Sequence, residues 1–433
     1  MMSTPLYRQP RRARGRTLRS ACVAALAIAS VSAGVSSASA QQNCVDLPNP
    51  ILGIGGSAPT NLVKRLGARL AGATPPITVV YSDPGACQAM TALVPNATTG
   101  KVTPLSGSGK YWTAAGVETP CVYPSGSTVE ADWGSMAQEA STCSGVDKLP
   151  ANVGDYLGPI SGFSLIVPNG SDQFAISSEA VYYIYGFGAG TGKDVPPWTN
   201  PAAIGTRTTT SAAGLLLAKA VGIPVARALA YLPANDVKTN QGAVDFITKV
   251  SEAAKTNPSS ALAFASTETA DANRATVRTL AFKAQGQDCS YFPDTDVTGT
   301  NSTDKKNLRE GRYFLWNPHH FFAKVDPTTK EIVKPALKSF INYLTSKEEL
   351  PATATSTESF LDLQIANGNV PTCAMRVTRT GDMGPLASFQ PEKPCNCYYD
   401  KKTTGTTTCQ ACTTSSECPA SAPLCNVGFC EVK

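Results

Sequence analysis

The sequence has few of the residues that most often carry catalytic or metal chemistry. Its 433 residues include two histidines, His319 and His320, and no Gly-x-Ser-x-Gly motif. Adjacent strand residues point to opposite faces, which argues against a shared metal ion, and no carboxylate or thiolate spacing supports one. A Ser-His-Asp triad would have to use one of these histidines, and no nucleophile elbow accompanies them. We therefore expect no enzyme activity, no metal and no cofactor.

An excess of positive charge is also lacking once the first forty residues are set apart. Those residues contain no acidic side chain and six arginines: Arg8, Arg11, Arg12, Arg14, Arg16 and Arg19. Without them, the 37 basic residues of the chain fall to 31, against 32 acidic ones. Nothing in that charge balance suggests nucleic-acid binding.

Long apolar runs are limited to one, from Ala21 to Ala33, which follows the arginines and precedes the small residues Ala38-Ser-Ala40. Together these features predict a secretory signal peptide over residues 1–40 and a mature chain that begins near Gln41. Cys22 lies at the start of the apolar run, where lipidation is not expected. No other apolar stretch is long enough to span a bilayer. We expect an exported protein, periplasmic or extracellular.

Cysteine, by contrast, is plentiful, and thirteen of the fourteen cysteines follow residue 40. In an exported protein, this number predicts disulfides rather than metal thiolates. Seven cysteines crowd residues 395–430, so Cys409-x-x-Cys412 is interpreted as part of a small disulfide-rich module and not as a redox or zinc pair. A bridge between Cys121 and Cys143 would close a short loop in the body. Because thirteen is odd, one thiol is free or intermolecular, or the tail is bridged to the body.

The body begins with a repeated order of strand, small-residue turn and helix. Residues 51–54 predict a strand, Gly55-Gly-Ser57 a turn, and Pro59 the start of a helix. A second strand over residues 77–81 meets Ser82-Asp-Pro-Gly-Ala-Cys, again before an expected helix. This order is typical of a parallel α/β sheet, whose ligands bind outside the carboxyl ends of the strands.

A second α/β unit is expected to begin near residue 160. It opens with a strand over residues 163–168 and a helix over residues 176–185 that Ser177 caps. Further helices are expected over residues 242–254, 335–343 and 360–366. Residues 313–316 are interpreted as a strand, and Gln390-Pro-Glu-Lys-Pro as a linker to the cysteine-rich tail.

The clearest binding signal lies at the start of one helix in this second unit. Arg207 is followed by four hydroxyl residues, Thr208 to Ser211, and the helix that follows is expected to end at Gly222. A helix start offers unpaired N–H groups and the positive end of the dipole, so hydroxyls and an arginine there favour an oxyanion. The alternative is that a serine or threonine only caps the helix.

Several motifs, in this order, resemble one family. They are Gly-Gly-Ser-Ala before the first helix, Val-Pro-Asn-Gly-Ser in the second unit, Pro-Trp-Thr-Asn-Pro, and Arg-x-x-x-Ser before a helix. The order resembles the type 2 periplasmic solute-binding proteins, specifically the phosphate-binding proteins of ABC transport systems. The stretch Arg309-Glu-Gly-Arg-Tyr-Phe-Leu-Trp-Asn-Pro-His-His resembles a secreted, cysteine-rich branch. The likeness covers roughly residues 48–345.

The resemblance implies an α/β fold of two lobes that are joined by crossover strands and enclose the ligand between them. Lobe 1 would comprise residues 44–158 and 290–375, and lobe 2 residues 160–288. Residues 390–433 would form the small disulfide-rich C-terminal module.

The resemblance also implies a set of ligand contacts. By position, these are Ser57 and Ala58 in the first loop, Gly85 and Ala86 in the second, and Arg207 and Ser211. Two positions depart from the family. Ala137 replaces an aspartate that accepts a proton only from a protonated oxyanion, which is how phosphate is distinguished from sulfate. Ala212-Ala213 replaces a Gly-Thr pair, which removes one hydroxyl.

Two further groups of residues have open interpretations. Asp132 and Ser135 could replace the missing pocket groups, although a loop turn fits them better. Large aromatic residues could line a cleft, although such side chains more often pack in a core: Tyr111, Trp112, Trp133 and Trp198.

The leading interpretation is an exported, non-enzymatic, monomeric solute-binding protein. It would capture a small oxyanion, phosphate or a phosphorylated compound, and present it to a membrane ABC permease. The alternative is a secreted or cell-surface interaction protein that keeps the fold, has lost phosphate binding and uses its tail for contact. Ala137 and the tail favour the second interpretation, whereas Arg207 and Ser211 favour the first. An enzyme on the same scaffold is a third interpretation, for which the sequence shows no catalytic set. The sequence decides neither the exact ligand nor the disulfide pairing.

Overall fold

The computed structural model describes residues 41–188, 192–207, 211–224, 235, 237–253, 257–295, 302–354 and 356–433. The predicted signal peptide lies outside the described residues, and so do Thr208, Thr209 and Thr210. Within the described part of the chain, no helix combines the length and the apolar character needed to cross a membrane.

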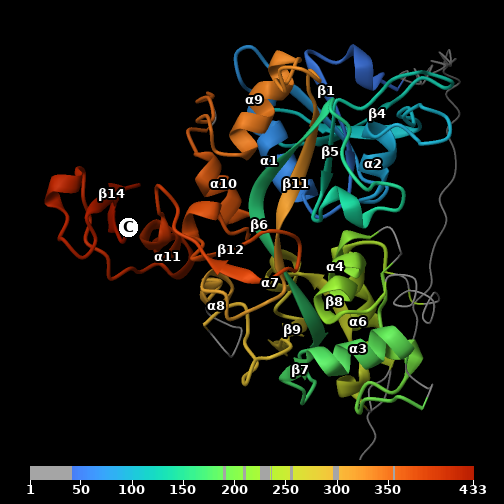
Figure 1. The fold of residues 1–433 in the computed structure, drawn as a ribbon, viewed down its shortest axis with the longest axis vertical. Coiled ribbons are helices and arrows are strands. Elements are labelled where there is room, and N and C mark those ends of the chain that lie inside the picture. The colour runs from blue at the N-terminus through green and yellow to red at the C-terminus, as the bar shows by residue number, and fades with distance from the viewer. Residues whose placement is uncertain are drawn as a thin grey trace, which may run out of the picture. The chain divides into compact units, whose positions relative to one another are not determined.

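A sheet of nine strands forms the centre of the described chain (Figure 1). The strands follow the order β4-β3-β2-β1-β5-β11-β6-β8, and β9 also pairs with β6. Their bounds are β1 (Pro50–Gly55), β2 (Thr78–Ser82), β3 (Ser108–Trp112), β4 (Glu118–Val122), β5 (Trp133–Met136), β6 (Val153–Pro168), β8 (Ala263–Ser266), β9 (Val277–Thr279) and β11 (Trp316–Lys324). The neighbours β2, β1 and β5 are parallel and the other pairs antiparallel. The predicted α/β class is confirmed.

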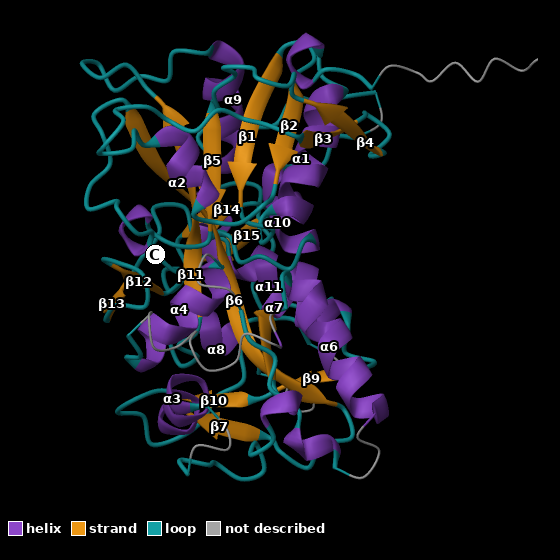
Figure 2. Ribbon diagram, turned by 90° about the vertical axis from the view of Figure 1, so that its right-hand side faces the viewer, coloured by secondary structure: helices purple, strands orange, loops and turns teal. Residues whose placement is uncertain are grey.

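Strand β6 pairs with different neighbours along its length (Figure 2). Residues 153–162 pair with β11, whereas residues 163–168 pair with β8 and β9. Its last eleven residues are all buried, as expected for a strand that is covered on both faces. The sequence predicted only residues 163–168 as strand. The earlier half was missed because Gly154, Gly158 and Pro159 have low strand propensity.

The helices lie close to their predicted positions. Their bounds are α1 (Thr60–Ala71), α2 (Gln88–Leu93), α3 (Ser178–Phe187), α4 (Ala212–Val221), α6 (Asn240–Ala253), α7 (Thr267–Ala272), α8 (Lys306–Arg309), α9 (Pro335–Leu344), α10 (Phe360–Ala366) and α11 (Asn396–Thr404). Ser177 caps α3, since its Oγ accepts a hydrogen bond from the Ala180 amide at 3.2 Å. Gly222 ends α4 in the left-handed conformation, with φ of 75°. Both predictions are confirmed.

Residues 313–315 are not part of a strand, although the sequence predicted one from residue 313. Strand β11 begins at Trp316. Tyr313 is instead fixed by its side chain, whose hydroxyl donates to the Phe163 carbonyl at 2.5 Å. Shorter pairs complete the strands: β7 (Ala175–Ser177) with β10 (Ala281–Lys283), β12 (Val377–Arg379) with β13 (Leu386–Ser388), and β14 (Leu424–Asn426) with β15 (Phe429–Glu431).

The large aromatic residues pack in the core. The Trp133 ring stacks on Tyr81 at 5.2 Å between centroids and contacts Phe340 at 4.8 Å. A Cβ at Gly53 would lie 2.1 Å from the Trp133 ring, so only glycine allows this approach. Trp112 and Trp198 are also buried. The core interpretation of these tryptophans therefore holds, and the cleft interpretation does not.

The disulfides of the body differ from the predicted bridge between Cys121 and Cys143. Cys121 pairs with Cys44, and Cys143 pairs with Cys87. The reason is topological, because residue 43 forms a bridge with Val122 of β4 and brings Cys44 beside Cys121. Among the described cysteines, Cys289 is unpaired and exposed.

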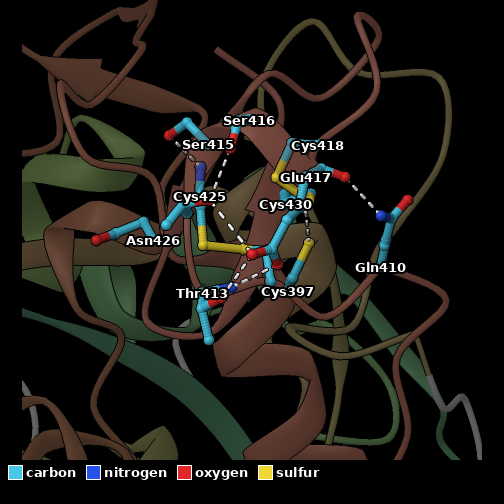
Figure 3. Close-up of a disulfide and its surroundings, with 12 residues drawn as sticks. Cys397, Gln410, Thr413, Ser415, Ser416, Glu417, Cys418, Cys425, Asn426 and Cys430 are labelled. Atoms are coloured by element: carbon cyan, nitrogen blue, oxygen red, sulfur yellow. Dashed lines mark hydrogen bonds between the residues drawn. A yellow bond between two sulfur atoms is a disulfide. The ribbon is translucent and has the colours of Figure 1, made fainter.

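The tail forms four disulfides, one of them to the body. The pairs are Cys373–Cys395, Cys397–Cys409, Cys412–Cys425 and Cys418–Cys430. Figure 3 shows how polar contacts supplement them, since the Glu417 carboxylate accepts from the Thr413 amide at 2.9 Å. Cys409 and Cys412 belong to separate disulfides, so the predicted disulfide-rich module is confirmed.

Candidate functional site

A cavity of about 270 Å³ lies where several helices begin. Three of these helices are long enough to carry a substantial dipole, with 12 residues in α1, 10 in α4 and 14 in α6. The lining comprises residues 56–58 before α1, 83–86 before α2, 211–213 at α4 and 238–240 at α6, together with Ala137, Phe163 and Arg207. The positive ends of the three longer helices therefore converge on one cavity.

All six predicted contact residues line this cavity: Ser57, Ala58, Gly85, Ala86, Arg207 and Ser211. They come from both of the sequence segments expected to form lobes. The structure thus brings together residues that are more than 150 positions apart in the sequence. Their role in ligand binding is a prediction.

The first loop is shaped by a close backbone approach at the end of β1. A Cβ at Gly55 would lie 2.0 Å from the Ser135 carbonyl oxygen, so the chain needs glycine there. The Gly56 amide donates to that same carbonyl at 3.0 Å, and the Tyr81 hydroxyl donates to the Gly56 carbonyl at 2.6 Å. These bonds place Ser57 and Ala58 at the cavity.

The second loop is joined to the first through Gly85. Its amide donates to the Gly55 carbonyl at 3.1 Å, and its φ of 152° favours glycine. This amide is therefore already occupied. The amides of Ser57, Ala58 and Ala86, by contrast, donate no hydrogen bond to any described residue. Unpaired amides at the lining of a cavity are suitable donors for an anion.

Arg207 is almost fully buried and is held by residues from two helices. Its Nε donates to Ser211 Oγ at 3.1 Å, and its Nη1 donates to Asn240 Oδ1 at 3.4 Å. Ser211 occupies the N-cap position of α4, but its side chain makes no capping hydrogen bond. Its hydroxyl instead orients the guanidinium, so the capping-only interpretation does not describe this serine.

The sequence did not single out the residues that α6 brings to the cavity. Lys238, Thr239 and Asn240 follow a stretch with no recognised motif, and only their position at a helix start could have indicated a role. Lys238 adds a second positive charge to that of Arg207. Asp83 is the only carboxylate among the described lining residues, and its Oδ2 accepts from Lys110 Nζ at 2.9 Å and from Thr60 Oγ1 at 3.1 Å.

Ala137 lines the cavity, so the position that aligns with the family's aspartate has no carboxylate. Asp132 and Ser135 do not replace it, because neither belongs to the lining. The Asp132 carboxylate accepts from the Leu52 amide and from Lys334 Nζ, each at 2.8 Å. Asp132 therefore has a structural role, and Ser135 is buried within β5.

Neither histidine belongs to the cavity lining. His320 Nδ1 lies 2.9 Å from Asp155 and its Nε2 lies 3.2 Å from Asp382. Burial alone would lower the pKa of His320, but these two carboxylates outweigh it and raise the pKa to about 9. Burial lowers the pKa of His319 to about 4. His320 thus holds a positive charge between two carboxylates, an arrangement the sequence did not predict because Asp382 is 62 residues away.

No protein-family model matches the chain, and no curated protein matches it. The solved structures that it resembles include phosphate-binding proteins and OxyR from Corynebacterium glutamicum. One is an ABC-type phosphate transport receptor from Vibrio cholerae, with 13% identity, 74% of this chain and 99% of that chain covered, and a TM-score of 0.45.

Two further solved structures also resemble the chain. A phosphate-binding protein from Stenotrophomonas maltophilia has 12% identity, with 74% of this chain and 90% of that chain covered, and a TM-score of 0.40. PstS from Borrelia burgdorferi has 10% identity, with 75% and 98% covered, and the same TM-score of 0.40. At TM-scores below 0.5, the chemistry of the site has to be inferred from its own residues.

Proposed function

We propose that this protein binds a small oxyanion of the phosphate type in the cavity at the helix starts. The observation that supports the proposal most is the convergence of a buried arginine with the starts of three helices on a cavity of about 270 Å³. Buried anions need opposite charge and hydrogen-bond donors on several sides. This cavity offers both, with Arg207 and Lys238 as its cations.

Each contact has a distinct part in the proposal. Arg207 supplies charge-assisted hydrogen bonds from a planar fork, pre-oriented by Ser211 and Asn240. The hydroxyls of Ser57 and Ser211 donate to the ligand. The unpaired amides of Ala58 and Ala86 complete the donor set, whereas the Gly85 side of the loop contributes shape.

The proposal includes the division into two lobes, residues 44–158 with 290–375 and residues 160–288. The cavity residues come from both segments, and β6 runs from one to the other. Binding would hold the lobes together around the ligand, and the closed form would be the one that a membrane permease recognises. The six disulfides suit an exported protein, since such bonds persist in oxidising compartments.

A thermal-shift titration of the purified, oxidised protein tests the proposal. The ligands are phosphate, sulfate, a phosphonate and a sugar phosphate, each with wild type, Arg207→Ala and the control Arg312→Ala. Arg312 is exposed and pairs with Glu310. A ligand at one hundred times its Kd should stabilise wild type and the control by about 2.7 kcal/mol, and Arg207→Ala much less. No response of the folded wild type to any oxyanion would reject oxyanion binding and favour the surface-interaction alternative.

A further inference from the structure

A second and larger cavity adjoins the oxyanion cavity. Its volume is about 600 Å³, and it shares Asp83 and Pro84 with the smaller one. It lies beside α2, at the carboxyl ends of β1 and β2, and residues 103–106 and 108–110 form its far side. Small-molecule sites measure roughly 300–1,000 Å³, so the smaller cavity alone is at the lower limit. The two together suit a larger ligand than an inorganic anion.

The lining of the second cavity offers hydrogen-bond partners for the hydroxyl groups of a ligand. Apolar residues share the lining with six uncharged polar side chains: Ser82, Gln88, Thr91, Thr103, Ser106 and Ser108. Hydroxyl and amide groups both donate and accept hydrogen bonds, and so match a ligand whose own hydroxyls do the same. Lys110 is the single cation among its described lining residues.

Asp83 stands at the junction of the two cavities. Both of its hydrogen bonds, from Lys110 and Thr60, use Oδ2. Among the described residues, no group donates to its Oδ1. A carboxylate beside a bound oxyanion is repulsive unless the ligand places a donor between the two charges. A hydroxyl next to the anionic group would provide that donor.

The absence of a carboxylate at position 137 agrees with a ligand that carries a hydroxyl next to its anionic group. A carboxylate in the anion cavity would serve a ligand that carries a P–OH proton. A phosphate monoester has its second pKa near 6, so above pH 7 it is mainly a dianion without such a proton. An ester therefore needs no hydrogen-bond acceptor at position 137. The hydroxyls of its substituent need an acceptor instead, and Asp83 lies where it can accept from them.

We propose that the ligand is a phosphate monoester with a hydroxyl-bearing substituent, such as a polyol or sugar phosphate. This rests on the proposed oxyanion binding. The phosphoryl group lies in the smaller cavity with Arg207 and Ser211. The substituent lies in the larger cavity, where its hydroxyls donate to Asp83 Oδ1 and meet the polar side chains around Lys110.

Calorimetric titration of the full exported protein at pH 7.5 tests this proposal with four ligands. Inorganic phosphate tests the contribution of the anionic group alone, ethyl phosphate adds the ester, and glycerol 3-phosphate adds the hydroxyls. Glucose 6-phosphate, as a fourth ligand, separates a sugar from a short polyol. We expect glycerol 3-phosphate or glucose 6-phosphate to bind at least tenfold more tightly than ethyl phosphate and inorganic phosphate.

Two variants locate the substituent. Thr91 is an exposed residue of α2 that lines only the second cavity, so Thr91→Trp should fill it and remove the preference for the hydroxylated ester, while phosphate affinity stays within about twofold. Thr328→Trp, at an exposed position outside both cavities, is the matched control. Asp83→Asn, which adds no bulk, should reduce the preference for the hydroxylated ester over phosphate at least fivefold.

The outcomes separate this proposal from the one on which it rests. Equal affinities of wild type for phosphate and for the hydroxylated esters would overturn the ester proposal and leave oxyanion binding intact. A preference that survives in Thr91→Trp would also overturn it. If wild type binds none of the four ligands, oxyanion binding itself is wrong and the ester proposal falls with it.

Discussion

Arg207 and Ser211 are joined by a hydrogen bond of 3.1 Å, from the guanidinium Nε to the serine Oγ. The serine occupies the N-cap position of α4, yet its hydroxyl accepts from the arginine rather than from the helix. The hydroxyl hydrogen remains able to donate toward the cavity. The pair therefore forms a pre-oriented donor unit, with little rearrangement needed on binding.

Replacing Ser211 should weaken ligand binding beyond what the loss of stability explains. In Ser211→Ala, the oxyanion affinity should fall about tenfold, because the arginine loses its orienting partner and the ligand loses a donor. Unfolding stability should also fall by about 1 kcal/mol, because the buried Arg207 Nε loses its acceptor although no capping bond is lost. Ser177→Ala is the control for an affinity loss that follows from lower stability alone. Its hydroxyl does cap α3, so stability should fall by about 1 kcal/mol with ligand affinity unchanged. Titration calorimetry and denaturant unfolding measure the two quantities, and an equal pattern in both variants would contradict the prediction.

Ala137 offers a test of anion selectivity. The residue is buried and lines the cavity, so Ala137→Asp places a carboxylate beside the ligand. A carboxylate repels fully ionised sulfate and accepts a hydrogen bond from hydrogen phosphate. We expect the ratio of phosphate to sulfate affinity to rise at least tenfold over wild type. Ala137→Asn has nearly the same shape without the charge, so a similar rise in Asn would show that charge is not the cause.

The pH dependence of stability should show the ion pairs of His320. Its pKa is raised to about 9 in the folded protein, from an ordinary value of 6.5. The stabilisation is therefore complete below about pH 6.5 and is lost as the pH rises to about 9, with a total of about 3 kcal/mol. Denaturant unfolding between pH 6 and 10 measures it. In His320→Gln, the loss of stability between about pH 6.5 and 9 should be smaller by this amount. The same pH dependence in the variant and in wild type would show that His320 is not its cause.

His319 provides an internal comparison on the acid side. Burial lowers its pKa to about 4, so the unfolded chain takes up a proton below about pH 6.5 while the folded chain does not. Its contribution to stability is lost as the pH falls from about 6.5 to about 4. The difference between wild type and His319→Gln should therefore change with pH in the acid range and stay constant above pH 7.

The disulfides should differ in their effect on the cavity. Cys87 follows Ala86 in the sequence, and its bridge to Cys143 spans 56 residues. Replacing both with serine should lower stability by about 4 kcal/mol on the loop-entropy model and weaken ligand binding, because the second loop is released. Cys412–Cys425 spans 13 residues in the tail. Its double serine variant should lose stability locally and keep the wild-type Kd. Equal losses of affinity in the two variants would contradict this.

Much of the candidate site could be predicted because its parts have local signals. A glycine-rich turn after an apolar strand, and an arginine followed by hydroxyls before a helix, are both visible within short windows. The alternation of strands and helices likewise gave the α/β class. Arg207 was predicted in this way, whereas the family resemblance implied Ser57 and Gly85, and the structure brings all three to one cavity.

The remaining features depend on contacts between distant residues. Asn240 reaches Arg207 across 33 residues, and Cys44 reaches Cys121 across 77, so neither has a signal within a short window. Asp83 was passed over because Ser82-Asp-Pro-Gly is typical of a turn. The early half of β6 was missed because glycine and proline conceal a strand that its neighbours impose.

The C-terminal module is tied to the body on three sides. The predicted linker over residues 390–394 ends at the Cys373–Cys395 disulfide, Arg309 pairs with Asp400, and the Tyr398 hydroxyl donates to Asp362 at 2.6 Å. A flexible linker of this length would let the module move relative to the body by roughly ten ångströms. With these contacts, the module is held in place against the body rather than flexibly tethered to it. Any surface to which it attaches would hold the entire protein in one fixed direction, and so decide which way the mouth of the ligand cavity faces.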